Sequence, residues 1–239
     1  SFNSFSIFHI TNETINIWSH LIGFFYFSYC QIERNFYSLP AIDSSLMDHL
    51  VISLSLFGSQ MCMLLSAAFH IFGCQSKKKR QKYLKFDLFG ISSGILSMYI
   101  TGIYTSFFCF ENHLTNYLGL LFLLFIITGM VPFREETLFK RKVIGSRIGW
   151  LHIIYSAVIL FGLLPTVHWI YLHGGLDNEH VVEWIPNVLV VYSLTAAAFF
   201  FYVSMIPEKL TPGIFDVVGC SHQWWHMLIL AAMVRWQVR

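Results

Sequence analysis

The sequence predicts an all-α membrane protein, a bundle of seven transmembrane helices. Its 239 residues are 56% hydrophobic and only 12% charged, with a mean hydropathy of +0.60. A soluble domain is roughly 45–50% apolar. Seven apolar segments each reach the roughly 17–25 residues that a spanning helix needs. Helices satisfy their own backbone hydrogen bonds, so they suit the hydrocarbon layer.

One seven-helix domain is therefore expected over residues 15–239, preceded by a cytosolic interfacial lead-in over residues 1–14. The expected spans are Ile15–Ile32, Leu46–Phe72, Leu84–Phe110, Leu114–Phe133, Ile148–Leu172, Ile185–Ile206 and Phe215–Val234.

The lead-in carries Phe2, Phe5 and Phe8 at threefold spacing, which favours a short helix lying on the membrane surface. A frayed segment is the alternative. Asn12 begins a glycosylation pattern that we expect to stay unmodified, because the charges place it in the cytosol. Glu13 and the neighbouring asparagines are expected to cap the first helix.

Basic residues predict the orientation. Twelve lie in the connections that follow the second, fourth and sixth spans, against three on the other side. By the positive-inside rule the N-terminus is cytosolic and the C-terminus is lumenal or extracellular. The twelve are Lys77, Lys78, Lys79, Arg80, Lys82, Lys85, Arg134, Lys140, Arg141, Lys142, Arg147 and Lys209, and the three are Arg34, Arg235 and Arg239.

Taken in order, several spans have a distinctive feature. The second ends with Ser66 and His70, four residues apart on one helix face. The third begins near Asp87, and its Gly90-x-x-x-Gly94 spacing predicts close approach to a neighbour. The fifth contains Pro165, which predicts a kink.

The seventh span supplies the strongest site candidate. His222 and His226 lie four residues apart, so their imidazoles share one helix face and could bind a metal. Gln223 stands where a zincin protease has its general-base glutamate, which excludes that class of site. The predicted topology puts His70, Asp87, His222 and His226 at one depth near the cytosolic boundary. A carboxylate within a span is costly and indicates a functional site.

Three imidazoles from two helices suit catalytic zinc with an open fourth position. Zinc would generate hydroxide near neutral pH and polarise a carbonyl, with Asp87 as proton acceptor and Ser66 orienting it or stabilising an oxyanion. Two alternatives stay open. The histidines and the aspartate could simply fix helix packing, and His20 and His152 are rival ligands at similar depth. We prefer His70 because Ser66 faces the same way.

Five motifs together resemble the progestin and adipoQ receptor family, which includes the adiponectin receptors. They are Asn12–Leu21, Ser66-x-x-x-His70, Phe86-Asp87-x-x-Gly90, Pro165–Trp169 and Ser221-His222-Gln223-x-x-His226. The resemblance covers nearly the whole chain and implies seven helices with a cytosolic N-terminus. It also implies zinc held by His70, His222 and His226, with Asp87 close to the bound water.

Within the family, the sequence is most similar to the Golgi member that traps Raf kinase. This implies a regulator or scaffold that sequesters Raf kinase at its cytosolic face and dampens its signalling, in the Golgi rather than the plasma membrane. The alternative, implied by the adiponectin receptors, is a zinc-dependent hydrolase of ceramide-like lipid amides. Membrane lipids, ceramide, another sphingolipid or a fatty acid are the expected ligands of the bundle, and no nucleic-acid partner is expected.

Overall fold

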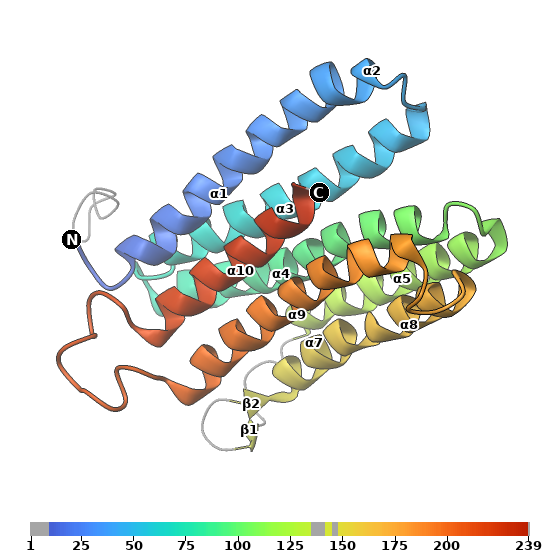
Figure 1. Cartoon of the computed structure of the whole chain (residues 1–239). Coiled ribbons are helices and arrows are strands. Elements are labelled where there is room, and N and C mark those ends of the chain that lie inside the picture. The colour runs from blue at the N-terminus through green and yellow to red at the C-terminus, as the bar shows by residue number, and fades with distance from the viewer. Residues whose placement is uncertain (1–9, 135–141, 145–147, 239) are drawn as a thin grey trace.

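The computed structural model describes residues 10–134, 142–144 and 148–238, and its helices lie side by side in one bundle (Figure 1). Along the chain they are α1 (Thr14–Glu33), the π-helix η2 (Arg34–Ser38), α2 (Leu39–Ala41), α3 (Leu46–Phe72), α4 (Lys77–Phe107), α5 (Glu111–Met130), the 3₁₀-helix η3 (Val131–Phe133), α7 (Trp150–Phe161), α8 (Leu163–Leu172), α9 (Glu179–Ser204) and α10 (Ser221–Gln237). Two short antiparallel strands, β1 (Lys142–Ile144) and β2 (Ile148–Gly149), precede α7.

Over the described residues these elements form the seven predicted segments, because α1 continues through η2 into α2 and α7 is followed directly by α8. Five segments are long and apolar enough to cross a membrane, and the ranges are Leu46–Phe72, Lys77–Phe107, Glu111–Phe133, Trp150–Leu172 and Glu179–Ser204. The other two are α1 and α10, which carry polar residues of the site described below. Helix α10 has 17 described residues.

Several predicted boundaries were wrong. Helix α4 begins at Lys77 rather than Leu84, because the Ser76 hydroxyl accepts a hydrogen bond from the Lys79 backbone N–H. The basic run therefore forms the first turns of a helix instead of a loop. Helix α10 begins at Ser221 rather than Phe215, since Gly219 has a φ of +85° that ends the preceding connection.

Helix α9 begins at Glu179, not Ile185, because the Asn178 side chain accepts from the backbone N–H groups of His180 and Val181. Pro186 lies inside it. The helix continues through this proline, which membrane helices tolerate.

A kink was predicted at Pro165, and the helical segment is interrupted three residues earlier, at Gly162 between α7 and α8. Pro165 has no N–H to donate to the carbonyl of Phe161, four residues earlier. Gly162 also allows a close approach, since a Cβ there would lie 2.5 Å from the hydroxyl oxygens of both Tyr99 and Tyr192. The side chains of two neighbouring helices therefore fill the space at the break.

The close approach predicted for Gly90 and Gly94 is confirmed between α3 and α4. A Cβ on Gly90 would lie 3.3 Å from the Cα of Cys62, and one on Gly94 would lie 3.0 Å from its Sγ. Cys62 belongs to a buried cluster with Phe27, Leu56, Met63 and Met233. This cluster packs α1, α3 and α10 together.

We call the end of the bundle where α3 stops and α10 starts the histidine end. It also holds the start of α1 and the long connection from α9 to α10 (Figure 1). The other end is called the opposite end. The predicted surface helix of Phe2, Phe5 and Phe8 lies outside the described residues.

Candidate metal centre

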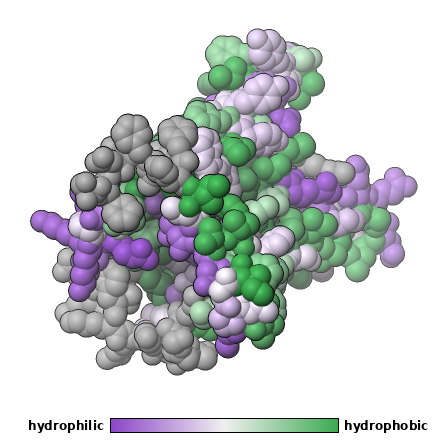
Figure 2. Space-filling model, turned by 90° about the vertical axis from the view of Figure 1, so that its left-hand side faces the viewer, coloured by the Kyte–Doolittle hydropathy of each residue, from purple (hydrophilic) through white to green (hydrophobic). Residues whose placement is uncertain are grey.

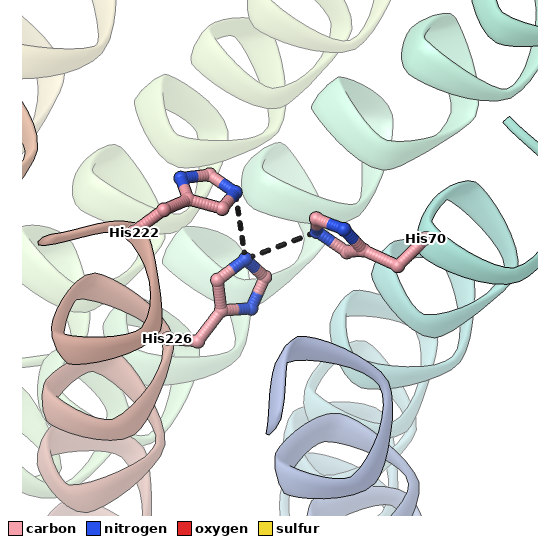
Figure 3. A group of neighbouring side chains, drawn as sticks. All are labelled: His70, His222 and His226. Atoms are coloured by element: carbon pink, nitrogen blue, oxygen red, sulfur yellow. Dashed lines mark hydrogen bonds between the residues drawn. The ribbon is translucent and has the colours of Figure 1, made fainter. Parts of the chain in front are cut away.

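Three histidines meet at the histidine end of the bundle. His70 is in the last turn of α3, and His222 and His226 lie one turn apart at the start of α10. Figure 3 shows their rings pointing toward one another from the two helices. His70 and His226 are buried and His222 is half-buried.

Gln223 holds the start of α10 in place. Its side-chain nitrogen donates to the backbone carbonyls of Asn12 at 3.0 Å and Val217 at 2.8 Å. Its side-chain oxygen accepts from the Gly219 N–H at 2.6 Å. Gln223, which stands in the position of the zincin glutamate, therefore ties the segment before α1 and the α9–α10 connection to the start of α10.

The ring nitrogens have metal-site spacing. The Nε2 atom of His226 lies 3.1 Å from that of His70 and 3.1 Å from that of His222, and all three atoms lie within 4.8 Å of one another. Two nitrogens bound to one tetrahedral zinc at about 2.0–2.1 Å are separated by about 3.3 Å. A cation at this point would satisfy all three lone pairs, so the residues present fit a metal ion.

The other ring nitrogens have partners that orient the rings. The Nδ1 of His70 lies 2.6 Å from Oε2 of Glu13, and the Nδ1 of His226 lies 2.7 Å from Nε2 of His20. A histidine that donates from Nδ1 presents the Nε2 lone pair to the centre. Partners of this kind usually stand behind metal-binding histidines.

Glu13 precedes α1 and was expected to cap it, but its side chain makes no capping hydrogen bond. The carboxylate instead accepts from His70 and from Asn16 Nδ2 at 2.9 Å. Burial raises the pKa of Glu13, while the hydrogen bonds from His70 and Asn16 lower it, and the net pKa lies below its usual value. The residue is therefore a carboxylate at neutral pH.

The two rival ligands lie elsewhere. His20 stands behind His226 rather than beside the converging Nε2 atoms. His152 is engaged by the Tyr202 hydroxyl at 2.9 Å and by the Gly149 N–H at 3.1 Å. The sequence did not predict that Glu13 and His20 would contact the Nδ1 atoms of His70 and His226, although both residues belong to the Asn12–Leu21 motif.

Asp87 and Ser66 lie beside the histidines. Ser66 and His70 both lie close to the Asp87 side chain. Asp87, Ser66 and the three histidines all line one cavity. Their catalytic roles stay predictions.

The cavity has a volume of about 850 Å³ and extends along the interior of the bundle. From the histidines it passes between apolar side chains toward Arg235 and Trp184. Most of its middle stretch is lined by hydrocarbon, including Ile91, Ile95, Val191, Ile229 and Met233. This apolar lining suits an alkyl chain better than a polar metabolite.

Comparison with known proteins assigns the family. The haemolysin-III-related family matches residues 8–237. Progestin and adipoQ receptor family member 3 of Homo sapiens is 34% identical over 232 residues, which cover 97% of this chain and 73% of that protein. Heptahelical transmembrane protein 1 of Arabidopsis thaliana is 31% identical over 95% of this chain and 68% of its own length, and the Drosophila melanogaster adiponectin receptor protein is 28% identical over 95% of this chain and 49% of its own length. The chain is therefore a multi-pass membrane protein that belongs to the haemolysin-III-related family, together with the progestin and adipoQ receptors.

Proposed function

We propose that this protein is a zinc-dependent hydrolase of membrane lipid amides of the ceramide type. The observation that carries the proposal is the convergence of three histidine Nε2 atoms on a cavity that Asp87 and Ser66 also line. Three imidazoles with an open fourth position form a ligand set that catalytic zinc uses.

Zinc held by His70, His222 and His226 would supply an ionised water near neutral pH and polarise the substrate carbonyl. Asp87 would accept a proton, and Ser66 would orient its carboxyl group, since both line the cavity beside the histidines. Glu13 and His20 fix the orientation of two ligand rings. The apolar middle of the cavity would bind the acyl chain and exclude water from it.

The proposed orientation places the histidine end at the cytosolic face, following the positive-inside rule. Lys77, Lys78 and Lys79 begin α4 at that end, in agreement with the rule. A lipid amide would then enter from the inner leaflet.

The test is turnover of a fluorescent ceramide by purified, zinc-loaded protein in detergent. We expect Asp87→Asn to abolish release of the fatty acid while keeping about one zinc per chain, and His226→Ala to lose both. His152→Ala is the control for the metal, because His152 lies outside the converging group, and it should keep its zinc. A zinc-loaded protein that is inert toward a panel of lipid amides would contradict the proposal.

A second candidate is regulation of Raf kinase at the Golgi, which rests on the motif resemblance given above. One structural feature favours a protein partner at the histidine end. The connection from α9 to α10 exposes Leu210, Ile214 and Val218, which are 69%, 70% and 55% exposed. Figure 2, which views this end, shows hydrophobic side chains grouped at the surface beside hydrophilic ones.

This candidate is tested by imaging. Expressed protein should localise to the Golgi and draw Raf kinase there, and Leu210→Asp with Ile214→Asp should weaken recruitment without changing zinc content. Asp87→Asn is the control, since it should abolish hydrolysis alone. Failure to recruit Raf kinase would exclude this role and leave the hydrolase proposal standing.

A further inference from the structure

Arg235 is a charged residue placed well inside the bundle. It lies in the last turn of α10 and donates a short hydrogen bond to Oδ1 of Asn187 on α9. Asn187 is eight residues from the start of α9, which corresponds to about 12 Å at 1.5 Å per residue.

The neighbours of Arg235 confirm this depth. Gln237 donates to the hydroxyls of Ser55 at 2.7 Å and Ser59 at 3.1 Å, and Ser59 lies midway along α3. Trp236 donates to the Thr101 hydroxyl at 2.9 Å. The guanidinium of Arg235 is therefore held among the interiors of other spans.

The charge of Arg235 is not neutralised. No carboxylate among the described residues forms a salt bridge with it, and its Nε is buried without a hydrogen-bond partner in that part of the chain. Its one side-chain acceptor, Asn187, is uncharged. A charged group within a membrane bundle normally pairs with another charge or marks a ligand site.

The cavity supplies the space for such a ligand. Arg235 and Asn187 both line it, as do the histidines. Its described carboxylates are Glu13, Asp87 and Glu208, which all belong to the histidine end. Arg80 also lines the cavity at the histidine end, and Arg34, which donates to the Val238 carbonyl, lines it near the end of α10. The described carboxylates are therefore confined to the histidine end, and an apolar stretch separates them from Arg235.

We propose that Arg235 and Asn187 bind the anionic group of a single-chain amphiphile whose alkyl chain lies in the cavity toward the histidines. The anion is a carboxylate or a phosphate monoester, the two groups that a guanidinium binds with paired hydrogen bonds. His226 and Arg235 are nine residues apart on α10, about 13 Å along the helix. The stretch between them is lined by the hydrocarbon that an alkyl chain requires.

This inference does not depend on hydrolysis. A fatty acid released at a metal centre would place its carboxylate at the histidines, whereas the ligand proposed here has the reverse orientation. Such a ligand would occupy the space that the acyl chain of a substrate needs, so it would compete with the substrate.

The first test is binding to the purified chain in detergent. The probes are hexadecanoate, hexadecyl phosphate and hexadecanol. We expect the two anions to bind at least about tenfold more tightly than the alcohol, and Arg235→Gln to remove that difference. Tighter binding of hexadecanoate would indicate that the natural ligand is a free fatty acid, and tighter binding of hexadecyl phosphate that it is a phosphate-bearing lipid. Lys78→Gln is the matched control, because it removes a positive charge that is exposed and does not line the cavity.

Two further variants keep the test decisive. Asn187→Asp would supply an internal carboxylate to Arg235, so it should abolish anion binding while raising the melting temperature, even if Arg235→Gln fails to fold. The same titrations on His222→Ala, which removes a proposed zinc ligand, should keep the preference for anions. If His222→Ala loses the preference for anions over the alcohol and Arg235→Gln keeps it, the anion binds at the histidines and the inference is wrong.

The second test reads the orientation. A hexadecanoate with a diazirine at its far end should label peptides around Ser66 and Asp87 after illumination. Labelling confined to Trp169 and Trp184 would mean that the chain points to the opposite end, and would contradict the proposal.

Discussion

The Nδ1 atom of His70 lies 2.6 Å from Oε2 of Glu13, a residue 57 positions earlier that precedes the first helix. This contact joins the segment before α1 to the end of α3. It also sets which nitrogen of His70 faces His222 and His226.

We expect Glu13→Gln to weaken zinc binding by roughly 10–100-fold, the range found when a partner behind a metal ligand is removed. The amide would no longer provide a charged acceptor for the His70 N–H. Zinc affinity is measured by competition with a chelator. Glu111→Gln, at the exposed start of α5, is the control and should leave the affinity unchanged. Equal affinities in all three proteins would remove Glu13 from the centre.

Zinc removal should destabilise the fold. A ligand that binds only the folded state at 100 times its Kd stabilises it by about 2.7 kcal/mol. Because the three histidines join α3 to α10, chelation should lower the melting temperature of the wild type, and it should have no effect on His70→Ala. An equal shift in both proteins would show that the chelator acts elsewhere.

Gly162→Ala should destabilise the bundle by about 1–3 kcal/mol, the usual cost of overpacking. The new methyl group would meet the hydroxyls of Tyr99 and Tyr192 at 2.5 Å. Gly119→Ala is the matched control, because a Cβ there meets nothing within 4 Å and alanine favours the helix. Thermal unfolding in detergent should therefore move in opposite directions for the two variants.

Gln223→Glu would create the H-E-x-x-H pattern of a zincin, but we expect it to destabilise the fold. The glutamate carboxylate has no N–H to donate, so both hydrogen bonds to the carbonyls of Asn12 and Val217 would be lost. Its oxygen would instead face these carbonyl oxygens and be repelled by them. We expect a loss of stability of about 2 kcal/mol or more. Gln75→Glu introduces the same charge beside the Lys79 ammonium and should change little. If both variants melt at the wild-type temperature, Gln223 has no structural role.

Much of this architecture follows from local sequence. The lengths of the apolar segments predicted all seven helices, and the spacing of His222 and His226 predicted that they share a face. Gly90 and Gly94 predicted the close approach of α3 and α4. The starts of the helices were harder to predict. Helix α4 begins at Lys77 and α9 at Glu179 because Ser76 and Asn178 cap them, but these polar stretches look like loops in the sequence.

By itself, the sequence determined which segments suit a membrane and which residues could bind a metal, because these properties depend on composition and on short spacings. Only the tertiary structure decided that Glu13 and His20 stand behind the histidines, and that Arg235 meets an asparagine instead of a carboxylate. These contacts join residues 57, 206 and 48 positions apart. They depend on how helices pack in three dimensions, which no local pattern of residues records.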